Sequence, residues 1–355
     1  MALCSPRNLI GVGLLTVAVA ACGSPSATDT SSATDGSASA MIIEISSSLP
    51  EDSFAGVFLR EFEERVETEL AGQVDIELFY GGVLGSEQDV LQGLKVGTHQ
   101  ATLSASGVAE INPRTAIFDL PYLFETRDDV VAMMDGPAGD LLRQGFADEG
   151  MELLALWDNG YRVITNNVRP IETPADLDGL KIRTPNSAFR VEMFQTLGAN
   201  PTPLSFSEVY SALDQGVVDG QENPANVVDS ALLYEVQDYL SVSNHVYLPT
   251  FLLFSQQTLD SMPDETRETL TQIAVDMGDW SREWGENNTE ETLAGLEDKI
   301  AINEVDFAAF QEASQPLYTS ETFTEEIGSD MIEATLASVS SNTVALETSS
   351  DSTAE

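Results

Sequence analysis

The chain has 355 residues, of which 59 are acidic and 15 are basic, so its formal net charge at pH 7 is −44. Such a negative chain argues against nucleic acid and anionic lipid surfaces as partners. Both cysteines, Cys4 and Cys22, lie near the N-terminus, so the folded body has no disulfide and no cysteine metal site. About 300 residues follow residue 40, which is enough for a large core, and we expect two lobes.

The first 40 residues predict export and tethering. Residues 9–21 form an apolar run that is too short to span a bilayer, which needs about 20 residues, but suits a secretory signal. The run ends in Val-Ala-Ala before Cys22, which resembles a bacterial lipobox, so residues 1–22 are interpreted as a lipoprotein signal with Cys22 as the lipidated residue. The alternative is an ordinary cleavage site beside a bystander cysteine. Residues 23–40, rich in Gly, Ser, Ala, Thr and Asp, predict a flexible tether.

The next segments alternate between strand and helix patterns. Residues 41–47 predict a strand, and an amphipathic helix follows with its apolar face at Phe54, Phe58, Phe62 and Val66. Residues 73–79 alternate as a half-buried strand, and a glycine-rich turn then leads into a helix over 86–96. Residues 153–166 form a long extended stretch interrupted at Asn159-Gly160. This alternation predicts an α/β fold.

The second half of the chain shows two capped starts and one long helix. Thr173-Pro174 predicts a short turn, and Ser205 with Glu208 has the spacing of a capping box for a helix that ends at Gly216. Residues 247–255 predict a strand. From Pro263 to about residue 300 an apolar stripe repeats at three and four, with Trp280 and Trp284 interpreted as core residues. Residues 341–355 are predicted to be a disordered acidic tail.

The sequence carries no signature of an enzyme. It has no G-x-S-x-G, H-E-x-x-H or phosphate-binding G-x-x-x-x-G-K-[ST] motif. The two histidines are His99 and His245, and we interpret His245, beside apolar and aromatic neighbours, as a structural hydrogen-bonding residue. We therefore expect no catalysis, no cofactor and no metal.

A cluster of basic residues stands out from this acidic background. Five of the 15 basic residues fall between positions 162 and 190: Arg162, Arg169, Lys181, Arg183 and Arg190. The segment 181–184 reads as a short strand that places Arg183 opposite Ile182. An arginine on a rigid strand offers a planar fork of donors that fits a carboxylate. A surface ion pair with one of the many acidic residues is an equally good explanation from the spacing alone.

Several motifs resemble one family, the DctP-type binding proteins of TRAP transporters. The longest matches are GLKIR at 179–183, LGA at 197–199, PLSFSEVY at 203–210 and ALDQGVVDGQENP at 212–224. Shorter matches are LGSE at 84–87, DLPYLF at 119–124 and NHVY at 244–247. The resemblance covers residues 41–300, and it is most specific over 179–224.

The resemblance implies two α/β lobes joined by crossing strands, with a long helix braced across both, as in periplasmic binding proteins. On this basis residues 41–160 and about 249–290 form lobe I. Residues 161–248 and about 291–340 form lobe II with the C-terminal helices. The family binds organic acids in the cleft between the lobes and delivers them to a sodium-driven membrane permease.

The resemblance also implies a binding site, residue by residue. Arg183 matches the arginine that clamps the ligand carboxylate, Arg162 matches a second arginine near the ligand, and Asn223 matches an amide that contacts the same carboxylate. Glu87 matches a position that selects the rest of the ligand. The sequence departs from the family at 259–263, which lack the usual tryptophan, and at 47–52, which lack a common histidine.

The sequence therefore predicts an extracytoplasmic, lipid-anchored solute-binding protein of a TRAP transporter. Its ligand is a small organic acid such as a dicarboxylate, keto acid or sugar acid. A sensory subunit of a signalling system on the same fold is the first alternative. An extracytoplasmic lyase or hydrolase on this scaffold is the second.

Overall fold

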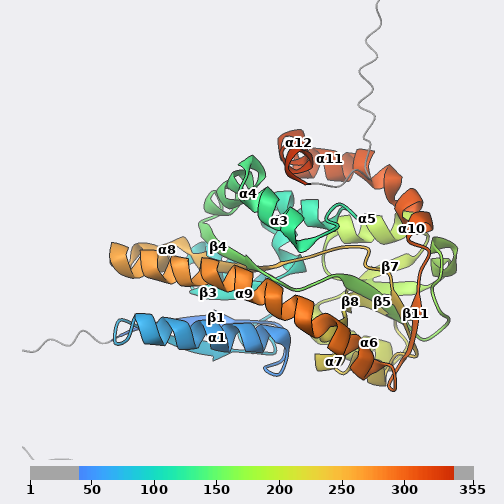
Figure 1. Cartoon of the computed structure of the whole chain (residues 1–355), viewed down its shortest axis with the longest axis horizontal. Helices are drawn as coiled ribbons and strands as arrows, with labels where there is room; N and C mark the ends of the chain where they lie inside the picture. Colours follow the sequence, from blue (N-terminus) through green and yellow to red (C-terminus); the bar gives the residue numbers. More distant parts are fainter. Residues whose placement is uncertain (1–39, 340–355) are drawn as a thin grey trace, which may run out of the picture. The chain divides into compact units, whose positions relative to one another are not determined.

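The computed structural model describes residues 40–339 and contains two β-sheets (Figure 1). The first sheet has five strands. Its strands, in the spatial order β2-β1-β3-β10-β4, are β1 (Met41–Ser46), β2 (Val74–Phe79), β3 (Ala101–Ser104), β4 (Met151–Trp157) and β10 (Thr250–Ser255). Strands β1, β2 and β3 are parallel, and β10 runs antiparallel to β3 and β4. The connecting helices α1 (Phe54–Glu69) and α2 (Glu87–Val96) confirm the elements predicted at this end of the chain.

A second, six-stranded sheet has the order β11-β9-β5-β8-β6-β7. Its strands are β5 (Arg162–Asn166), β6 (Lys181–Thr184), β7 (Asn200–Pro203), β8 (Gly220–Pro224), β9 (Tyr239–Val242) and β11 (Ala301–Glu304). The helices α5 (Ala188–Thr196), α6 (Val209–Asp214) and α7 (Ala225–Ser230) connect them. The capping box at Ser205 and Glu208 forms as predicted, and a short 3₁₀ turn precedes α6.

Two chain crossings join the sheets. Residues 158–161 lead from β4 into β5, and residues 243–249 lead from β9 into β10, with an antiparallel bridge between Tyr161 and Tyr247. The predicted break at Asn159-Gly160 is confirmed, and Gly160 adopts the positive φ of 97° that this turn requires. The predicted strand over 247–255 starts later, at Thr250, because the residues before it belong to the second crossing.

The long helix α9 (Asp264–Leu296) packs against both sheets. Its first half buries Leu270 and Met277 in the core of the first sheet, and its last residue, Leu296, lies in the core of the second. Trp280 and Trp284 meet the ring of Phe58 edge-on at centroid distances of 5.6 and 5.3 Å. They are partly buried and pack against the core of the first sheet, at its edge. Figure 1 shows α9 running from α1 toward α6 and α7.

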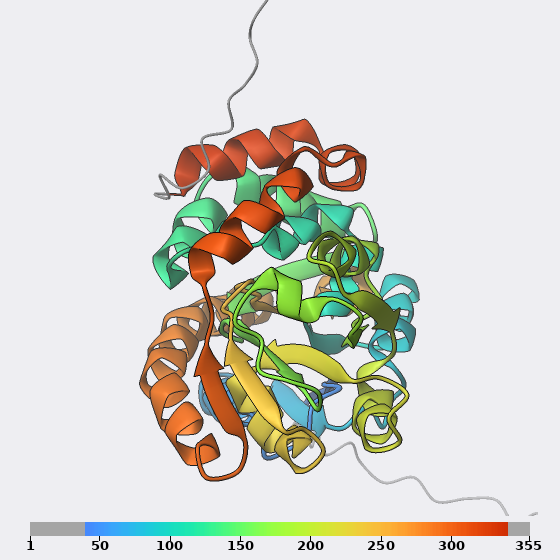
Figure 2. The same cartoon turned by 90° about the vertical axis from the view of Figure 1, so that its right-hand side faces the viewer.

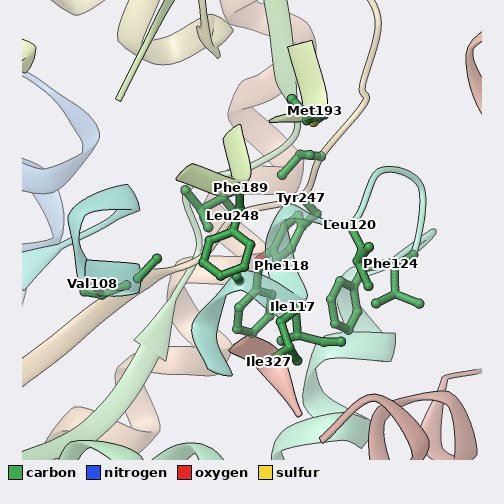
Figure 3. Close-up of a cluster of buried hydrophobic side chains, with 14 of the residues drawn as sticks. Val108, Ile117, Phe118, Leu120, Phe124, Phe189, Met193, Tyr247, Leu248 and Ile327 are labelled. Carbon is green, nitrogen blue, oxygen red and sulfur yellow. The ribbon is translucent and has the colours of Figure 1, made fainter. Parts of the chain in front are cut away.

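The C-terminal helices cover the other side of the molecule. Helices α10 (Phe307–Ser314), α11 (Glu321–Ile327) and α12 (Ser329–Ser338) follow β11, and α12 packs on α3 (Arg127–Met134) and α4 (Pro137–Ala147), as Figure 2 shows in red over green. Figure 3 shows the apolar cluster beneath, where Phe118, Phe189, Tyr247 and Ile327 meet. This cluster draws on both predicted lobes, so their boundaries stay a prediction.

Within residues 40–339, no helix combines the length and apolarity needed to cross a bilayer. The predicted signal with Cys22, the tether as far as residue 39 and the tail over 341–355 lie outside the described residues.

Candidate functional site

All four site residues predicted from the sequence line one cavity between the two sheets. Glu87 comes from the start of α2, on the side of the first sheet. Arg162, Arg183 and Asn223 come from β5, β6 and β8 of the second sheet. The cavity has about 520 Å³ of empty space. We call it the arginine cavity, because Arg162 and Arg183 are its basic lining residues.

A second cavity of about 470 Å³ adjoins it. Both cavities are lined by Ser48, Glu87, Arg183, Pro185 and Phe206. The second cavity is also lined by hydroxyl and amide side chains: Ser86, Gln88, Asn186, Ser205 and Ser207. We call it the serine cavity. The shared residues make the two spaces neighbouring parts of one site, with Arg183 and Glu87 facing both.

Arg183 is buried but has no ion-pair partner among the described residues. Strand alternation turns Ile182 into the core and Arg183 to the opposite face, where the side chain is 3% exposed. Its Nε and Nη2 donate to the carbonyl oxygen of Leu204 at 3.0 and 2.6 Å. No ion pair joins it to any carboxylate in the part of the chain that the structure describes. The surface ion pair considered from the sequence is therefore wrong.

The environment of Arg183 lowers the pKa of its guanidinium, but the group keeps its proton at neutral pH. Burial lowers the pKa of Arg183 to about 10, with the positive charges of Arg162 and Arg190 acting in the same direction and Glu222 and Glu87 opposing them. The guanidinium therefore remains charged at neutral pH. A buried cation of this kind is costly until an anion compensates it.

Arg162, in contrast, is fully engaged within the protein. Its Nε and Nη2 donate to the carboxylate of Glu222, the Nη2 contact being 3.1 Å long, and Nη2 also donates to Oδ1 of Asn223 at 3.0 Å. The amide nitrogen of Asn223 donates to Oε1 of Gln221 at 2.6 Å. Both predicted residues thus face the cavity while being held in place by β8.

The sequence did not predict the buried ion pairs that link Arg162 and Arg190 to Glu222 and Asp119. Arg190 is fully buried; its Nη1 donates to Glu222 Oε2 at 2.9 Å and its Nη2 pairs with Asp119. Burial alone would raise the pKa of Glu222, but Arg162 and Arg190 lower it well below its ordinary value. In the sequence, Arg190 stood out only as a member of the basic cluster. Asp119 and Glu222 were noted only as residues within the matched motifs.

His245 belongs to this structural group. It is fully buried, its Nδ1 lies 2.8 Å from Ser243 Oγ, and its Nε2 lies 3.4 Å from Glu222 Oε2. Burial lowers its pKa, so the imidazole is neutral at pH 7. These contacts confirm the interpretation of His245 as a structural residue.

Glu87 is a half-buried acid at the junction of the two cavities. Its Oε1 accepts the backbone N–H of Ala105 at 2.6 Å. Burial raises the pKa of Glu87, while the N–H groups of Ala105 and Gly107 act in the opposite direction. Glu87 is the acidic lining residue of these two cavities.

Asn159 is a lining residue that the sequence did not identify. It sits on the first crossing, lines the arginine cavity and is 3% exposed. Its Oδ1 is buried without a hydrogen-bond partner in residues 40–339. The sequence pointed to Asn159 only as a break between strands, and a polar side chain at such a crossing is the signal that was available.

Across the described residues, no group of three or more His, Cys, Asp or Glu side chains is arranged to hold a metal ion.

Comparison with known proteins matches the sequence profile of the bacterial extracellular solute-binding proteins, family 7 (DctP), to residues 45–325. The chain is 34% identical over 257 residues to the 2,3-diketo-L-gulonate-binding periplasmic protein YiaO of Escherichia coli, covering 72% of this chain and 78% of that protein. It is 30% identical over 306 residues to the C4-dicarboxylate-binding periplasmic protein DctP of Rhodobacter capsulatus, covering 84% and 90%. The structure is similar to the sugar acid binding protein DctPAm of Advenella mimigardefordensis in complex with galactonate. The TM-score is 0.80 at 30% identity, and the match covers 84% of this chain and 98% of that one.

Proposed function

Because the chain belongs to family 7 of the bacterial extracellular solute-binding proteins, we propose that it captures a carboxylate-bearing small molecule at Arg183. It then delivers that molecule to the membrane permease of a TRAP-type transporter. The observation that carries this proposal is the buried, charged guanidinium of Arg183, which lines two adjoining cavities and has no carboxylate partner among the described residues.

Electrostatics favours an anion at this point. The whole chain carries a net charge of −44, so an anionic ligand is repelled at long range and must be held by a local, enclosed positive group. A guanidinium gains far more from a carboxylate in a water-poor cavity than on a surface, because the effective dielectric constant is lower there. Its planar fork also matches the two carboxylate oxygens.

The neighbouring residues have roles consistent with this binding mode. Arg162 adds positive charge to the same wall, and Asn223 is a polar contact beside it. Relatives bind ligands of this kind: the named ligands are 2,3-diketo-L-gulonate, C4-dicarboxylates and galactonate. The protein acts by binding and release, not as an enzyme.

Arg183 provides the decisive test. D-galactonate, 2,3-diketo-L-gulonate and succinate are first screened by thermal shift, and the best binder is then titrated calorimetrically. Removing one partner of a buried, hydrogen-bonded charge pair costs about 2–5 kcal/mol, so Arg183→Ala should weaken binding about a hundredfold or more. Arg183→Lys keeps the charge but loses the fork, and it should also bind poorly.

Arg169→Ala is the matched control. Arg169 belongs to the same basic cluster and also donates to backbone carbonyls, those of Asp176 and Asp178, but it lines neither cavity. Its variant should bind like the parent protein. Near-parental affinity in Arg183→Ala would overturn the proposed role of Arg183.

We also propose that Cys22 anchors the protein to the outer face of the cytoplasmic membrane or to the periplasmic face of an outer membrane. The support is the position of Cys22 after small residues at the end of an apolar signal. Cys22→Ser should move the mature protein from the membrane fraction to the soluble fraction. Unchanged membrane association of that variant would contradict lipidation at Cys22.

A further inference from the structure

The charges around the site also bear on which acids it accepts. Resting on the proposed function, we infer that the ligand carries a single carboxylate and a hydroxyl-bearing remainder, as a hydroxy or sugar acid does. Dicarboxylates of the same chain length are disfavoured. The carboxylate lies at Arg183, and the hydroxyl groups point toward Glu87 and the serine cavity.

The first step is the number of uncompensated positive charges. Arg162 and Arg183 are the basic residues that line the two cavities. Arg162 already forms an ion pair with Glu222, and Arg190 behind it pairs with both Glu222 and Asp119. Three buried arginines therefore face the two buried carboxylates of Glu222 and Asp119, and Glu87 is the one further acid that lines the two cavities. Arg183 thus supplies at most one positive charge for one ligand carboxylate, and the cavity lining offers none for a second.

The second step is the chemistry of the remaining walls. Away from Arg183, the polar lining of the serine cavity consists of hydroxyl and amide groups and the acid Glu87, beside the apolar Pro185, Leu204 and Phe206. Among the described residues, no lysine, histidine or second arginine lines it. Hydroxyl and amide groups can exchange hydrogen bonds with ligand hydroxyls, acting as either donor or acceptor. They cannot neutralise a second carboxylate.

The third step concerns Glu87 itself. One oxygen accepts the N–H of Ala105, and Glu87 lines both cavities together with Arg183. A ligand hydroxyl that donates to this carboxylate would satisfy it, whereas a second ligand carboxylate would place two like charges in one partly dry space. Like-charge contacts across an interface are a strong source of discrimination between ligands.

The test uses acid pairs that differ only at the distal end. D-galactonate and galactarate share a six-carbon chain, and D-erythronate and meso-tartrate share a four-carbon chain. In each pair a terminal CH₂OH is replaced by a carboxylate. Calorimetric titration at neutral pH should show the monocarboxylate of the better-binding pair at least a hundredfold tighter than its dicarboxylate.

Two variants then assign the discrimination to charge at the junction. Glu87→Gln keeps the shape of the side chain and removes its charge, so the preference for the monocarboxylate should shrink by about tenfold or more. Gln88→Glu adds an acid to the same wall and should increase the preference. Unfolding temperatures without ligand verify that both variants are folded.

The outcomes separate this inference from the proposed function. If a dicarboxylate binds as tightly as its partner or tighter, and Arg183→Ala abolishes that binding, the inference is overturned while the proposed function stands. If the preference is present but neither variant changes it, the role of Glu87 is overturned. If no acid of the panel binds, or if binding is indifferent to Arg183→Ala, both proposals fail.

Discussion

Arginines with little or no exposure to water occur at the chain crossing and at the arginine cavity, and their surroundings differ in these two regions. At the chain crossing, Arg127 donates to Asp158 through Nε at 2.9 Å, and Tyr247 donates to the same carboxylate at 2.7 Å. The N–H of Asp158 donates to Ser281 of α9 at 3.0 Å. Arg127 and Asp158 thus neutralise each other inside the protein. In the arginine cavity, the one hydrogen-bond acceptor of the Arg183 guanidinium among residues 40–339 is the carbonyl oxygen of Leu204.

The difference distinguishes structural from functional charge. The Arg127–Asp158 pair at the crossing links α3, both crossings and α9, and it stabilises the contact between those segments. Arg183 links nothing of opposite charge, so its burial costs free energy in the unliganded protein. A bound ligand carboxylate would offset this cost. The variants below therefore separate a charge that stabilises the fold from one that serves binding.

The largest effect is expected at Glu222, which holds Arg162 and Arg190 together. Glu222→Gln leaves two buried guanidinium groups without their shared carboxylate. Breaking a buried pair in this way costs about 3–5 kcal/mol, and chemical denaturation should show a loss of that size. The double variant Glu222→Gln with Arg162→Met should recover part of the loss, because Arg190 keeps its pair with Asp119. Additive losses would contradict the pairing.

Glu222 should also produce a pH dependence. Its pKa in the folded protein is well below the ordinary 4.5, so its contribution to stability is complete above that value and is lost as the pH falls below it. From about pH 5 to about pH 3, the unfolding free energy should therefore fall less steeply in Glu222→Gln than in the parent protein. Equal slopes in the two proteins would contradict this assignment.

Asp158 should have the next largest effect. Asp158→Asn leaves Arg127 without its anion, but the Arg127 side chain is 12% exposed, so water offsets part of the loss. We expect about 2–3 kcal/mol of destabilisation, below the full range for a buried pair. Arg114→Ala, which breaks a more exposed pair with Asp330, is the control and should cost less than about 1 kcal/mol. A smaller loss at Asp158 than at Arg114 would refute the contrast.

A smaller effect is expected at Asn159, and it should appear in binding. The unpartnered Oδ1 of Asn159 lies in the lining of the arginine cavity, so it can accept a hydrogen bond from a ligand hydroxyl. A neutral hydrogen bond contributes about 0.5–1.5 kcal/mol, so Asn159→Ala should weaken binding of the best hydroxyl-bearing acid by about twofold to tenfold. The unliganded unfolding temperature should hardly change. A variant that loses stability but not affinity would make Asn159 a purely structural residue.

The smallest effect is expected for Arg183 without ligand. Arg183→Met removes an uncompensated buried charge and keeps much of the side-chain volume, so the unfolding free energy should change by less than about 1 kcal/mol or rise. Denaturation without ligand measures this change. When D-galactonate is added, the unfolding free energy should rise only in the parent protein. A loss as large as that of Glu222→Gln would show that Arg183 is structural.

Much of the fold was predictable because its signals are local. Apolar spacing predicted α1 and α9, alternation predicted β1 and β2, and the Ser205 capping box predicted a helix start, since each depends on residues a few positions apart. The motifs over 179–224 indicated the family, and with it the four residues that the structure brings to one cavity. The first residue of the strand predicted over 247–255 was less predictable, because the chain crossing that precedes β10 overrides local β-propensity.

The pairing of charges was decided by the tertiary structure. The sequence determined that five basic residues cluster between 162 and 190, but not which of them would be neutralised. Arg162 meets a glutamate 60 positions away and Arg190 meets an aspartate 71 positions away. With 59 acidic residues in the chain, no spacing rule selects those partners. Only the folded chain brings Glu222 and Asp119 to two of the arginines and leaves Arg183 facing a cavity, because ion pairs depend on distance in space, not along the chain.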